Sequence, residues 1–319
     1  MSTPRRAAII AMLKSADGVI SGETISTRLG ISRTAVWKQI QGLRAMGYPI
    51  TATATGYELG PTGDLLYPWE FPAWESRIHF ANVTASTMND ARRLAHDGCP
   101  QFTVVLAERQ TGGRGRLQRD WASPAGGLYF TVVLRPELPP ALSFRCAFAA
   151  SYELSLAIES VTGVRAAVKW PNDLLVDEAK VCGMLSEMET ESDWVKFLNI
   201  GIGINVNNAP PKDVPGATSL AEATGGPVPR ARLLETFLAG FEKRLAEDAL
   251  EDIVSRWKTR TVTIGREVRV ETRNAAVTGT AVDVDSLGGL VVKTPGGALE
   301  TVHYGDCFHV LPATEAVTP

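Results

Sequence analysis

The stretch Gln110-Thr-Gly-Gly-Arg-Gly-Arg116, followed by Arg119 and Trp121, places three glycines and three arginines within residues 112–121. Glycine lets a loop turn tightly and lets backbone N–H groups approach a ligand. Arginine presents forked donors that suit carboxylates and phosphates, and Trp121 adds a flat apolar surface. This composition indicates a loop that closes over an anionic ligand, although a solvated loop or an arginine-rich RNA contact would share it.

The segments on either side of this loop help to choose between these readings. Residues 102–107 and 127–134 are apolar runs rich in β-branched residues, which predicts two buried strands. A Gly/Arg loop held between two core strands is more typical of a ligand clamp than of a tail. It is not a phosphate loop of the Walker type, because no Gly-Lys-Ser/Thr follows it.

The composition sets the broad class of the protein. With 319 residues and 45% hydrophobic content, the chain is long enough for two or three domains. The four cysteines form no C-x-x-C pair and the four histidines lack metal-ligand spacing, so we expect neither a disulfide framework nor a zinc site. We expect no signal peptide, and because Arg145 and Glu153 interrupt the apolar region 141–158, we expect a cytoplasmic protein without a membrane span.

Charge is distributed unevenly along the chain, whose net charge is −3. Residues 1–63 hold seven basic and three acidic residues, whereas the remainder holds 25 basic and 32 acidic residues. A basic head on an acidic body suggests that only the head meets a polyanion.

The head has the pattern of a winged helix-turn-helix. We expect helices over 5–15 and 22–29, and a third from the cap Ser32 to about Met46, followed by a β wing over 48–59. Periodicity buries Val36, Ile40 and Leu43 and leaves the opposite face outside. The expected DNA contacts on that face are Arg33, Thr34, Lys38 and Gln41. Trp37 could pack against the body or contact DNA, and winged helices also serve as protein-docking modules, although the basic charge favours DNA.

Beyond the head the pattern changes twice. Residues 64–76 contain Pro68 and Pro72 and are interpreted as a linker. Residues 77–258 mix hairpin strands with helices over 87–96, 143–161 and 230–245, which favours an α+β fold with a mixed sheet. Residues 259–314 hold short strands separated by Asn, Gly and Pro, as expected of a small β-barrel.

Five motifs together resemble those of the biotin protein ligases in order and spacing. They are Ser86-Thr87, the stretch from Gln110 to Trp121, Lys169-Trp-Pro-Asn-Asp173, Lys180-Val-Cys-Gly183 and Asn199-Ile-Gly-Ile-Gly-Ile-Asn205. The resemblance covers nearly the whole chain, and the two flanking domains make it similar to the bifunctional kind, a ligase that is also a biotin-operon repressor. It implies an N-terminal winged helix, a class II synthetase-like catalytic domain and a C-terminal SH3-like barrel.

The resemblance also implies a two-step reaction. Biotin and MgATP give biotinyl-5′-AMP, and a lysine of the biotin carboxyl carrier protein of acetyl-CoA carboxylase then takes the biotin. Because the first step joins two anions, it needs fixed cations and Mg²⁺, and the implied catalytic cations are Arg116, Lys180 and Lys169. The implied biotin contacts are Ser86, Thr87, Met88, Gln110, Arg114, Gly115, Arg116, Lys180 and Gly183. The implied adenylate contacts are Gly113, Arg119, Trp121, Lys169, Asn172 and Asn205, with Asp173 on Mg²⁺.

Several alternatives and departures remain at this point. Lys169 and Asp173 could instead form an internal ion pair that shapes their turn. Many relatives carry Asn where this chain has Met88, and Gln118 replaces a glycine, so we expect a stiffer loop. Lipoate–protein ligases share the catalytic fold, and a regulator whose body mainly senses the adenylate is also compatible. The resemblance further implies a lid over 208–217 and a homodimer that competes with the carrier protein for one sheet edge.

Overall fold

The computed structural model describes residues 3–211, 214, 216–246, 250–273 and 275–310, and of Thr3 and Gln118 it describes the backbone alone. The chain separates into two compact units, Met1–Ala73 and Trp74–Pro319. Over the described residues, no helix is both long enough and apolar enough to cross a membrane.

The first unit is a helix-turn-helix with a wing. Its elements are α1 (Thr3–Ser15), α2 (Gly22–Leu29), α3 (Arg33–Ala45), β1 (Ile50–Ala52) and β2 (Tyr57–Leu59). The side chain of Ser21 accepts a hydrogen bond from Thr24 N at the start of α2, and Ser32 accepts one from Ala35 N at the start of α3. These caps satisfy backbone donors that the first turn of a helix leaves free. The two strands pair antiparallel.

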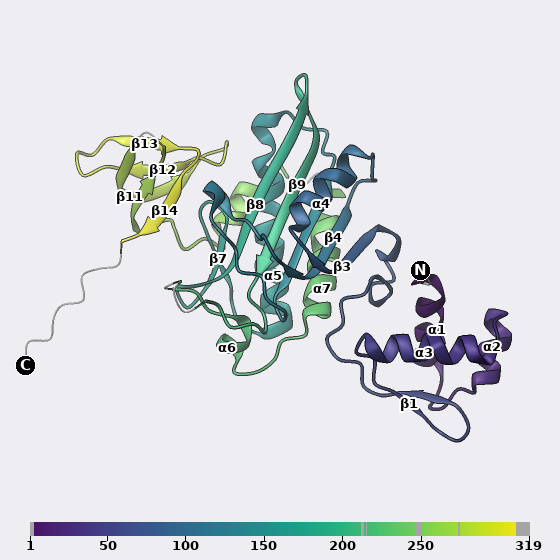
Figure 1. The fold of residues 1–319 in the computed structure, drawn as a ribbon. Helices are drawn as coiled ribbons and strands as arrows, with labels where there is room; N and C mark the ends of the chain where they lie inside the picture. The colour runs from purple at the N-terminus through teal and green to yellow at the C-terminus, as the bar shows by residue number, and fades with distance from the viewer. Residues whose placement is uncertain (1–2, 212–213, 215, 247–249, 274, 311–319) are drawn as a thin grey trace, which may run out of the picture. The chain divides into compact units, whose positions relative to one another are not determined.

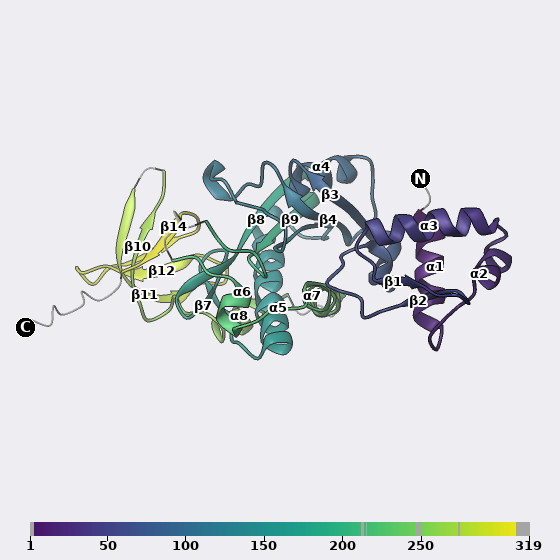
Figure 2. The same cartoon turned by 60° about the horizontal axis from the view of Figure 1, so that its bottom comes forward.

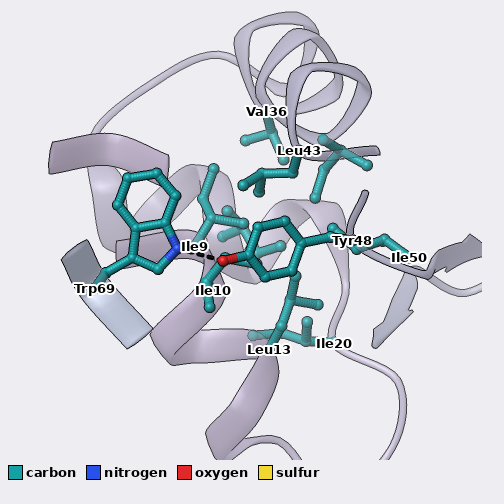
Figure 3. Packing of buried hydrophobic residues seen from close by; sticks show 11 residues of the cluster. Ile9, Ile10, Leu13, Ile20, Val36, Leu43, Tyr48, Ile50 and Trp69 are labelled. Carbon is teal, nitrogen blue, oxygen red and sulfur yellow. Dashed lines mark hydrogen bonds between the residues drawn. The ribbon is translucent and has the colours of Figure 1, made fainter. Parts of the chain in front are cut away.

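One apolar cluster holds this unit together (Figure 3). Val36, Ile40 and Leu43 of α3 are fully buried in it, as the periodicity predicts. Trp69 belongs to the same cluster, and its Nε1 donates to Tyr48 Oη at 2.5 Å. Trp69 lies in the short helix η1 (Pro68–Glu70), so part of the segment expected as a linker packs into the head.

The second unit is built on a seven-stranded mixed sheet (Figure 1). Its strands are β3 (Ile78–Thr84), β4 (Thr103–Gln110), β5 (Leu128–Leu134), β6 (Ala167–Lys169), β7 (Asp173–Val176), β8 (Ala179–Glu191) and β9 (Trp194–Ile204). The strand order is β3-β4-β5-β9-β8-β7-β6, with only β3 and β4 parallel. The predicted α+β class with a mixed sheet is confirmed.

Helices cover both faces of this sheet (Figures 1 and 2). On one face lies α4 (Thr87–His96), whose Ala91 and Ala95 pack against Val105 and Val133. On the other face Phe130 of β5 contacts Phe237 of α7. The remaining helices are α5 (Phe144–Thr162), α6 (Leu220–Thr224), α7 (Arg230–Ala246) and α8 (Ile253–Lys258), and the short ones are η2 (Glu75–Arg77), η3 (Arg116–Gln118) and η4 (Pro140–Leu142). Both α7 and α8 pack against α5.

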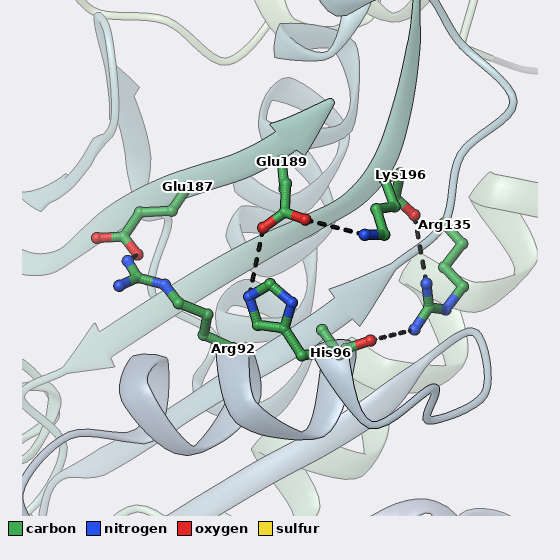
Figure 4. Close-up of polar contacts among 7 residues, drawn as sticks. Arg92, His96, Arg135, Glu187, Glu189 and Lys196 are labelled. Carbon is green, nitrogen blue, oxygen red and sulfur yellow. Dashed lines mark hydrogen bonds and ion pairs between the residues drawn. The ribbon is translucent and has the colours of Figure 1, made fainter. Parts of the chain in front are cut away.

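Polar contacts fasten α4 to the hairpin of β8 and β9 (Figure 4). Arg92 pairs with Glu187, and His96 Nε2 lies 3.3 Å from Glu189 Oε2. At the C-terminal end of α4, Arg135 Nη2 donates to Ala95 O at 2.7 Å, where helix carbonyls lack helical partners. These contacts fix the helix whose first turn borders the candidate site.

The C-terminal part is a five-stranded antiparallel β domain. Its strands are β10 (Glu267–Glu271), β11 (Ala276–Val284), β12 (Leu290–Lys293), β13 (Leu299–Val302) and β14 (Asp306–His309), in the order β13-β12-β11-β10-β14. The sequence pattern did not predict β14, and residues 311–314 of the expected domain lie outside the described residues. Trp170 Nε1 donates to Gly288 O at 3.0 Å and so joins this domain to the larger sheet.

Candidate active site

A cavity of about 750 Å³ opens where the Gly/Arg loop passes over the sheet. The first turn of α4, residues 110–123 and strands β8 and β9 surround it, together with Pro210, Pro211 and Asp306. It borders every residue that the sequence assigned to biotin or nucleotide except Lys169. Those bordering residues are Ser86, Thr87, Met88, Gln110, Gly113, Arg114, Gly115, Arg116, Arg119, Trp121, Asn172, Asp173, Lys180, Gly183 and Asn205.

Glycines on the strands make room for the indole of Trp121. A Cβ added at Gly203 would lie 2.4 Å from Trp121 Nε1, and one at Gly183 would lie 3.0 Å from its Cζ3. Lys180 Nζ stands 5.4 Å from the centre of the Trp121 ring, within the range of a cation–π contact. Trp121 Nε1 is buried and has no hydrogen-bond partner among the described residues, so the cavity contains an unused donor.

One end of the cavity is neutral and held by hydrogen bonds. Gln110 Oε1 accepts from Thr87 N at 2.8 Å and from Thr87 Oγ1 at 3.1 Å, and Gln110 Nε2 donates to Ser123 Oγ at 2.9 Å. Thr131 Oγ1 donates to Thr87 Oγ1 at 2.9 Å. Met88 is buried beside Gly201, where an added Cβ would lie 2.6 Å from its sulfur. These hydrogen bonds therefore fix the amide of Gln110 and the hydroxyl of Thr87 without a ligand.

The opposite end of the cavity is charged, and Arg116 is its centre. Arg116 Nη1 donates to Gly305 O at 3.0 Å and to Asn172 Oδ1 at 3.4 Å, and it lies 4.0 Å from Asp306 Oδ1. Arg119 forms an ion pair with the same Asp306. Burial lowers the pKa of the Arg116 guanidinium below its usual range, and the carboxylates of Asp306 and Asp173 act in the opposite direction.

Lys180 adds a second cation close to this end. Its Nζ lies 2.7 Å from Asp173 Oδ1, and both side chains border the cavity. The backbone of Lys180 is fixed as well, because its N–H donates to Gly216 O and its carbonyl accepts from Thr218 N. The ion pair that Asp173 forms is therefore with Lys180 and not with Lys169, the partner considered from the sequence.

Arg114 ties the loop to α4. Its Nη2 donates to Asn89 Oδ1 at 2.7 Å and lies near Glu187 Oε1, at 3.8 Å. Because Asn89 follows Met88 in the first turn of α4, this contact links the two segments that border the neutral end. Arg114 thus contributes to the shape of the cavity in addition to its charge.

Lys169 lies apart from the cavity that the other predicted residues share. It is on β6 opposite Asp173 in the register, and the turn between them contains a cis peptide bond before Pro171. Burial, with the nearby charges of Lys169 and Arg266, lowers the pKa of His309 to about 4. Lys169 is therefore close to His309 of the C-terminal domain and is not among the residues that line the cavity, and its contact with ATP stays a prediction.

The expected lid borders the cavity only in part. Pro210, Pro211, Val214 and Ala217 line it, whereas residues 212–213 and 215 lie outside the described residues. Asn205 is buried, and its Nδ2 donates to Thr218 O at 3.3 Å. The polar side chain of Asn205 thus anchors the end of this segment to β9.

Asp306 is a charged site residue that the sequence did not indicate. It is the first residue of β14, directly after Gly305 in the turn that follows β13, far along the chain from the Gly/Arg loop, and it belongs to none of the five motifs. Gly305 has φ +137°, and an added Cβ would lie 2.6 Å from Glu271 O, so the turn requires glycine. The signal that the sequence offers is weak, a glycine followed by an acidic residue at the start of a short strand.

The head carries its predicted DNA-contact residues on one face of α3. Arg33, Thr34 and Lys38 are exposed, and Gln41 is half-buried. The buried residues of α3 are on the opposite side of the helix. The head therefore offers a polar, basic helix face to a partner.

Comparison with known proteins decides the family. The sequence profile of the "Biotin/lipoate A/B protein ligase family" matches residues 80–207, that of the "HTH domain" matches 5–58, and that of the "Biotin protein ligase C terminal domain" matches 263–310. The bifunctional ligase/repressor BirA of Bacillus subtilis is 35% identical over 312 residues, covering 93% of this chain and 96% of that protein. The chain belongs to the biotin protein ligase family.

Other members of the biotin protein ligase family cover mainly the second unit. The biotin–[acetyl-CoA-carboxylase] ligase of Paracoccus denitrificans is 33% identical, covering 67% of this chain and 93% of that protein. Among solved structures, the biotin protein ligase from Aquifex aeolicus in complex with biotin and ATP aligns with a TM-score of 0.62 and 30% identity. It covers 73% of this chain and 97% of the Aquifex chain. The α+β body is therefore shared with relatives of shorter length.

Proposed function

We propose that this protein is an ATP-dependent ligase that joins biotin to a lysine of the biotin carboxyl carrier protein of acetyl-CoA carboxylase. The observation that carries the proposal is the division of one cavity into a neutral end and a charged end. Biotin has the same division, with an uncharged ureido ring and a carboxylate. The Aquifex relative that shares the fold is described in complex with biotin and ATP, which supports the same ligands here.

In the first step the biotin carboxylate attacks the α-phosphorus of ATP, and pyrophosphate leaves. Arg116 is the group we assign to the carboxylate, because two acceptors fix its Nη1 at the charged end. Lys180 stands beside it as the second cation. Together they offset the repulsion between two anions and the charge that develops on the phosphate. Gln110 and Thr87 would orient the ureido ring at the other end.

The donor set fits an Mg²⁺ ion that arrives with ATP. Among the described residues no group of three or more His, Cys, Asp or Glu side chains could hold a metal ion by itself. Mg²⁺ is usually held by one or two carboxylates and by substrate phosphates, so Asp173 would be its protein ligand. When bound, the ion would neutralise phosphate charge. Lys180 would then leave Asp173 and turn toward the substrate.

In the second step the amine of the carrier lysine attacks the acyl carbon of biotinyl-5′-AMP, and AMP leaves. The segment that contains Pro210 and Pro211 borders the cavity and would keep water from the mixed anhydride. We place the carrier at strand β3, because β3 ends the strand order and Val83 is 55% exposed. The other end of the sheet is covered, since Val168 of β6 pairs with residues 260–262.

Mass spectrometry of a carrier domain tests this proposal. We expect one lysine to gain the mass of biotin when the domain is incubated with this protein, biotin and MgATP. Replacing biotin with lipoate tests the alternative ligase activity, for which we expect no product. Modification by lipoate in preference to biotin would overturn the assignment.

We propose a second role for the head as a biotin-responsive repressor that binds operator DNA. The basic face of α3 and the similarity to bifunctional relatives support it. One helix-turn-helix rarely binds DNA tightly, so we infer an adenylate-bound homodimer on two half-sites. DNA affinity should rise when biotin and MgATP are both present. An equal affinity with and without these ligands would contradict repression by the adenylate.

A further inference from the structure

Trp37 is a large apolar side chain in the middle of the polar face of α3. It is 52% exposed, whereas Val36 and Ile40 of the same helix are fully buried. The core of the head is complete without it, since Trp37 is not part of the apolar cluster. Tryptophan combines a large apolar ring with one N–H donor and is enriched at interfaces, so this position suits contact with a partner that binds the polar face of α3.

The neighbours of Trp37 indicate which partner covers it. Helical geometry places Arg33 and Gln41 one turn before and one turn after Trp37, in the same row of side chains. Thr34 and Lys38 form the adjacent row, and both are exposed. The described residues place one acidic group near this face, Glu23, whose Oε2 lies 3.7 Å from Arg33 Nη1 with both side chains well exposed. The indole is thus surrounded by donors and cations, which suits a polyanion.

A major groove offers one apolar feature to such an indole. Phosphates and most base edges accept or donate hydrogen bonds, whereas the C5-methyl group of thymine is apolar. Trp37 is the fifth residue of α3, and in helix-turn-helix proteins the N-terminal part of the second helix contacts base edges. Arg33 and Lys38 can bind phosphates or guanine on either side of it.

We propose that Trp37 is a specificity-determining residue that reads a thymine methyl group in the operator. This inference rests on the proposed DNA-binding role of the head. It assigns Trp37 to base readout and the flanking cations mainly to affinity. The head then distinguishes thymine from cytosine or uracil at one position of each half-site.

The test uses the full chain with biotin and MgATP. A duplex is first selected by the protein from a random-sequence library, and each thymine in it is then replaced singly by uracil, which removes only the methyl group. At one position per half-site we expect the Kd of the natural sequence to rise about fourfold, the value for one buried methylene-sized group. Trp37→Ala should raise the Kd of the thymine duplex similarly and show no difference between thymine and uracil there.

Two matched variants control for folding and charge. Trp37→Phe retains an apolar ring and should keep part of the thymine preference. Lys38→Ala should weaken binding to all duplexes and lower the dependence of the Kd on salt, while the thymine preference remains. The salt dependence should not change in Trp37→Ala, and its melting temperature should match that of the natural chain because the residue is outside the core.

The outcomes separate the inference from the function on which it rests. If the library yields no bound duplex, the DNA-binding role itself fails. If duplexes bind but Trp37→Ala discriminates thymine from uracil as the natural chain does, Trp37 is not the reader and the inference is overturned. If Trp37→Ala alters adenylate formation and leaves DNA binding intact, Trp37 contacts protein and not DNA, and the inference is likewise overturned.

Discussion

The two ends of the ligand cavity are built in different ways. The neutral end is closed by short hydrogen bonds among Thr87, Gln110 and Ser123, which lie on or beside α4 and β4. The charged end joins three distant segments, because Arg116 contacts Asn172 after β6 and Gly305 in the C-terminal domain. One end is local and rigid, and the other depends on the packing of the C-terminal domain on the sheet.

This difference suggests that the two ends make different contributions to the reaction. Hydrogen bonds to an unreactive ring are equally strong before and during the reaction, so they lower the KM without raising kcat. Cations at the reacting atoms act most strongly where charge develops, so they raise kcat. Substitutions at the two ends should therefore separate in kinetics.

The largest effect is expected for Arg116→Ala. Loss of this guanidinium should lower the rate of pyrophosphate release from biotin and MgATP by about 10²–10³, because one preorganised donor at a developing charge typically contributes that much. Single-turnover measurement of pyrophosphate gives the rate. Arg116→Lys is the matched control and should recover part of it. A rate within about twofold of the natural chain in Arg116→Ala would exclude Arg116 from the reaction.

Substitutions at the two glycines that make room for Trp121 should weaken the binding of biotin. Gly203→Ala places a Cβ 2.4 Å from Trp121 Nε1, whereas Gly183→Ala places one 3.0 Å from Trp121 Cζ3. Overpacking of this kind costs about 1–3 kcal/mol, and the closer contact at Gly203 should have the greater effect. Calorimetric titration of biotin measures the loss of affinity. A weaker effect at Gly203 than at Gly183 would show that Trp121 does not occupy this position.

At the neutral end, Gln110→Ala should raise the KM for biotin about tenfold and leave kcat nearly unchanged. The substitution removes the acceptor of Thr87 N–H and the donor to Ser123, and an unsatisfied buried group costs about 1–3 kcal/mol. Steady-state kinetics with varied biotin measures both constants. Ser123→Ala removes one of these contacts only and should be milder. A fall in kcat alone would place Gln110 at the reacting atoms.

The smallest effect is expected for Asp306→Asn. Arg119 is 62% exposed, and an exposed ion pair contributes about 0–1 kcal/mol, so adenylate retention should fall by at most about fivefold. If the two side chains act as a pair, the double variant Arg119→Ala with Asp306→Asn should lose no more adenylate retention than either single variant. Release of labelled biotinyl-5′-AMP measures retention. Additive losses would show that the two side chains act separately.

The sequence predicted local features better than distant contacts. The cap Ser32, the buried face of α3 and the strands around the Gly/Arg loop follow from short-range patterns, and the structure confirms them. The burial of Trp69 and the existence of β14 were not predicted, because each depends on packing against residues remote in sequence.

The candidate site shows the same contrast between local motifs and distant contacts. Arg116 lies in the Gly/Arg loop, whose motif is local in the sequence, and the resemblance to biotin protein ligases implied its role. Asp306 lies 190 residues from Arg116 in the numbering, and no pattern within either segment indicates that the two side chains meet. A motif indicates residues that are near one another in the sequence, but it does not show which residues of the C-terminal domain complete the cavity.

Calorimetric comparison of biotin with its neutral amide tests the division of the cavity most directly. The natural chain should prefer biotin by about 10- to 150-fold, as expected for a hydrogen bond to a charged group of about 1.5–3 kcal/mol. In Arg116→Ala this preference should fall nearly to one, whereas Gln110→Ala should bind both compounds more weakly and keep the preference. A preference that persists in Arg116→Ala, or disappears in Gln110→Ala, would contradict the account.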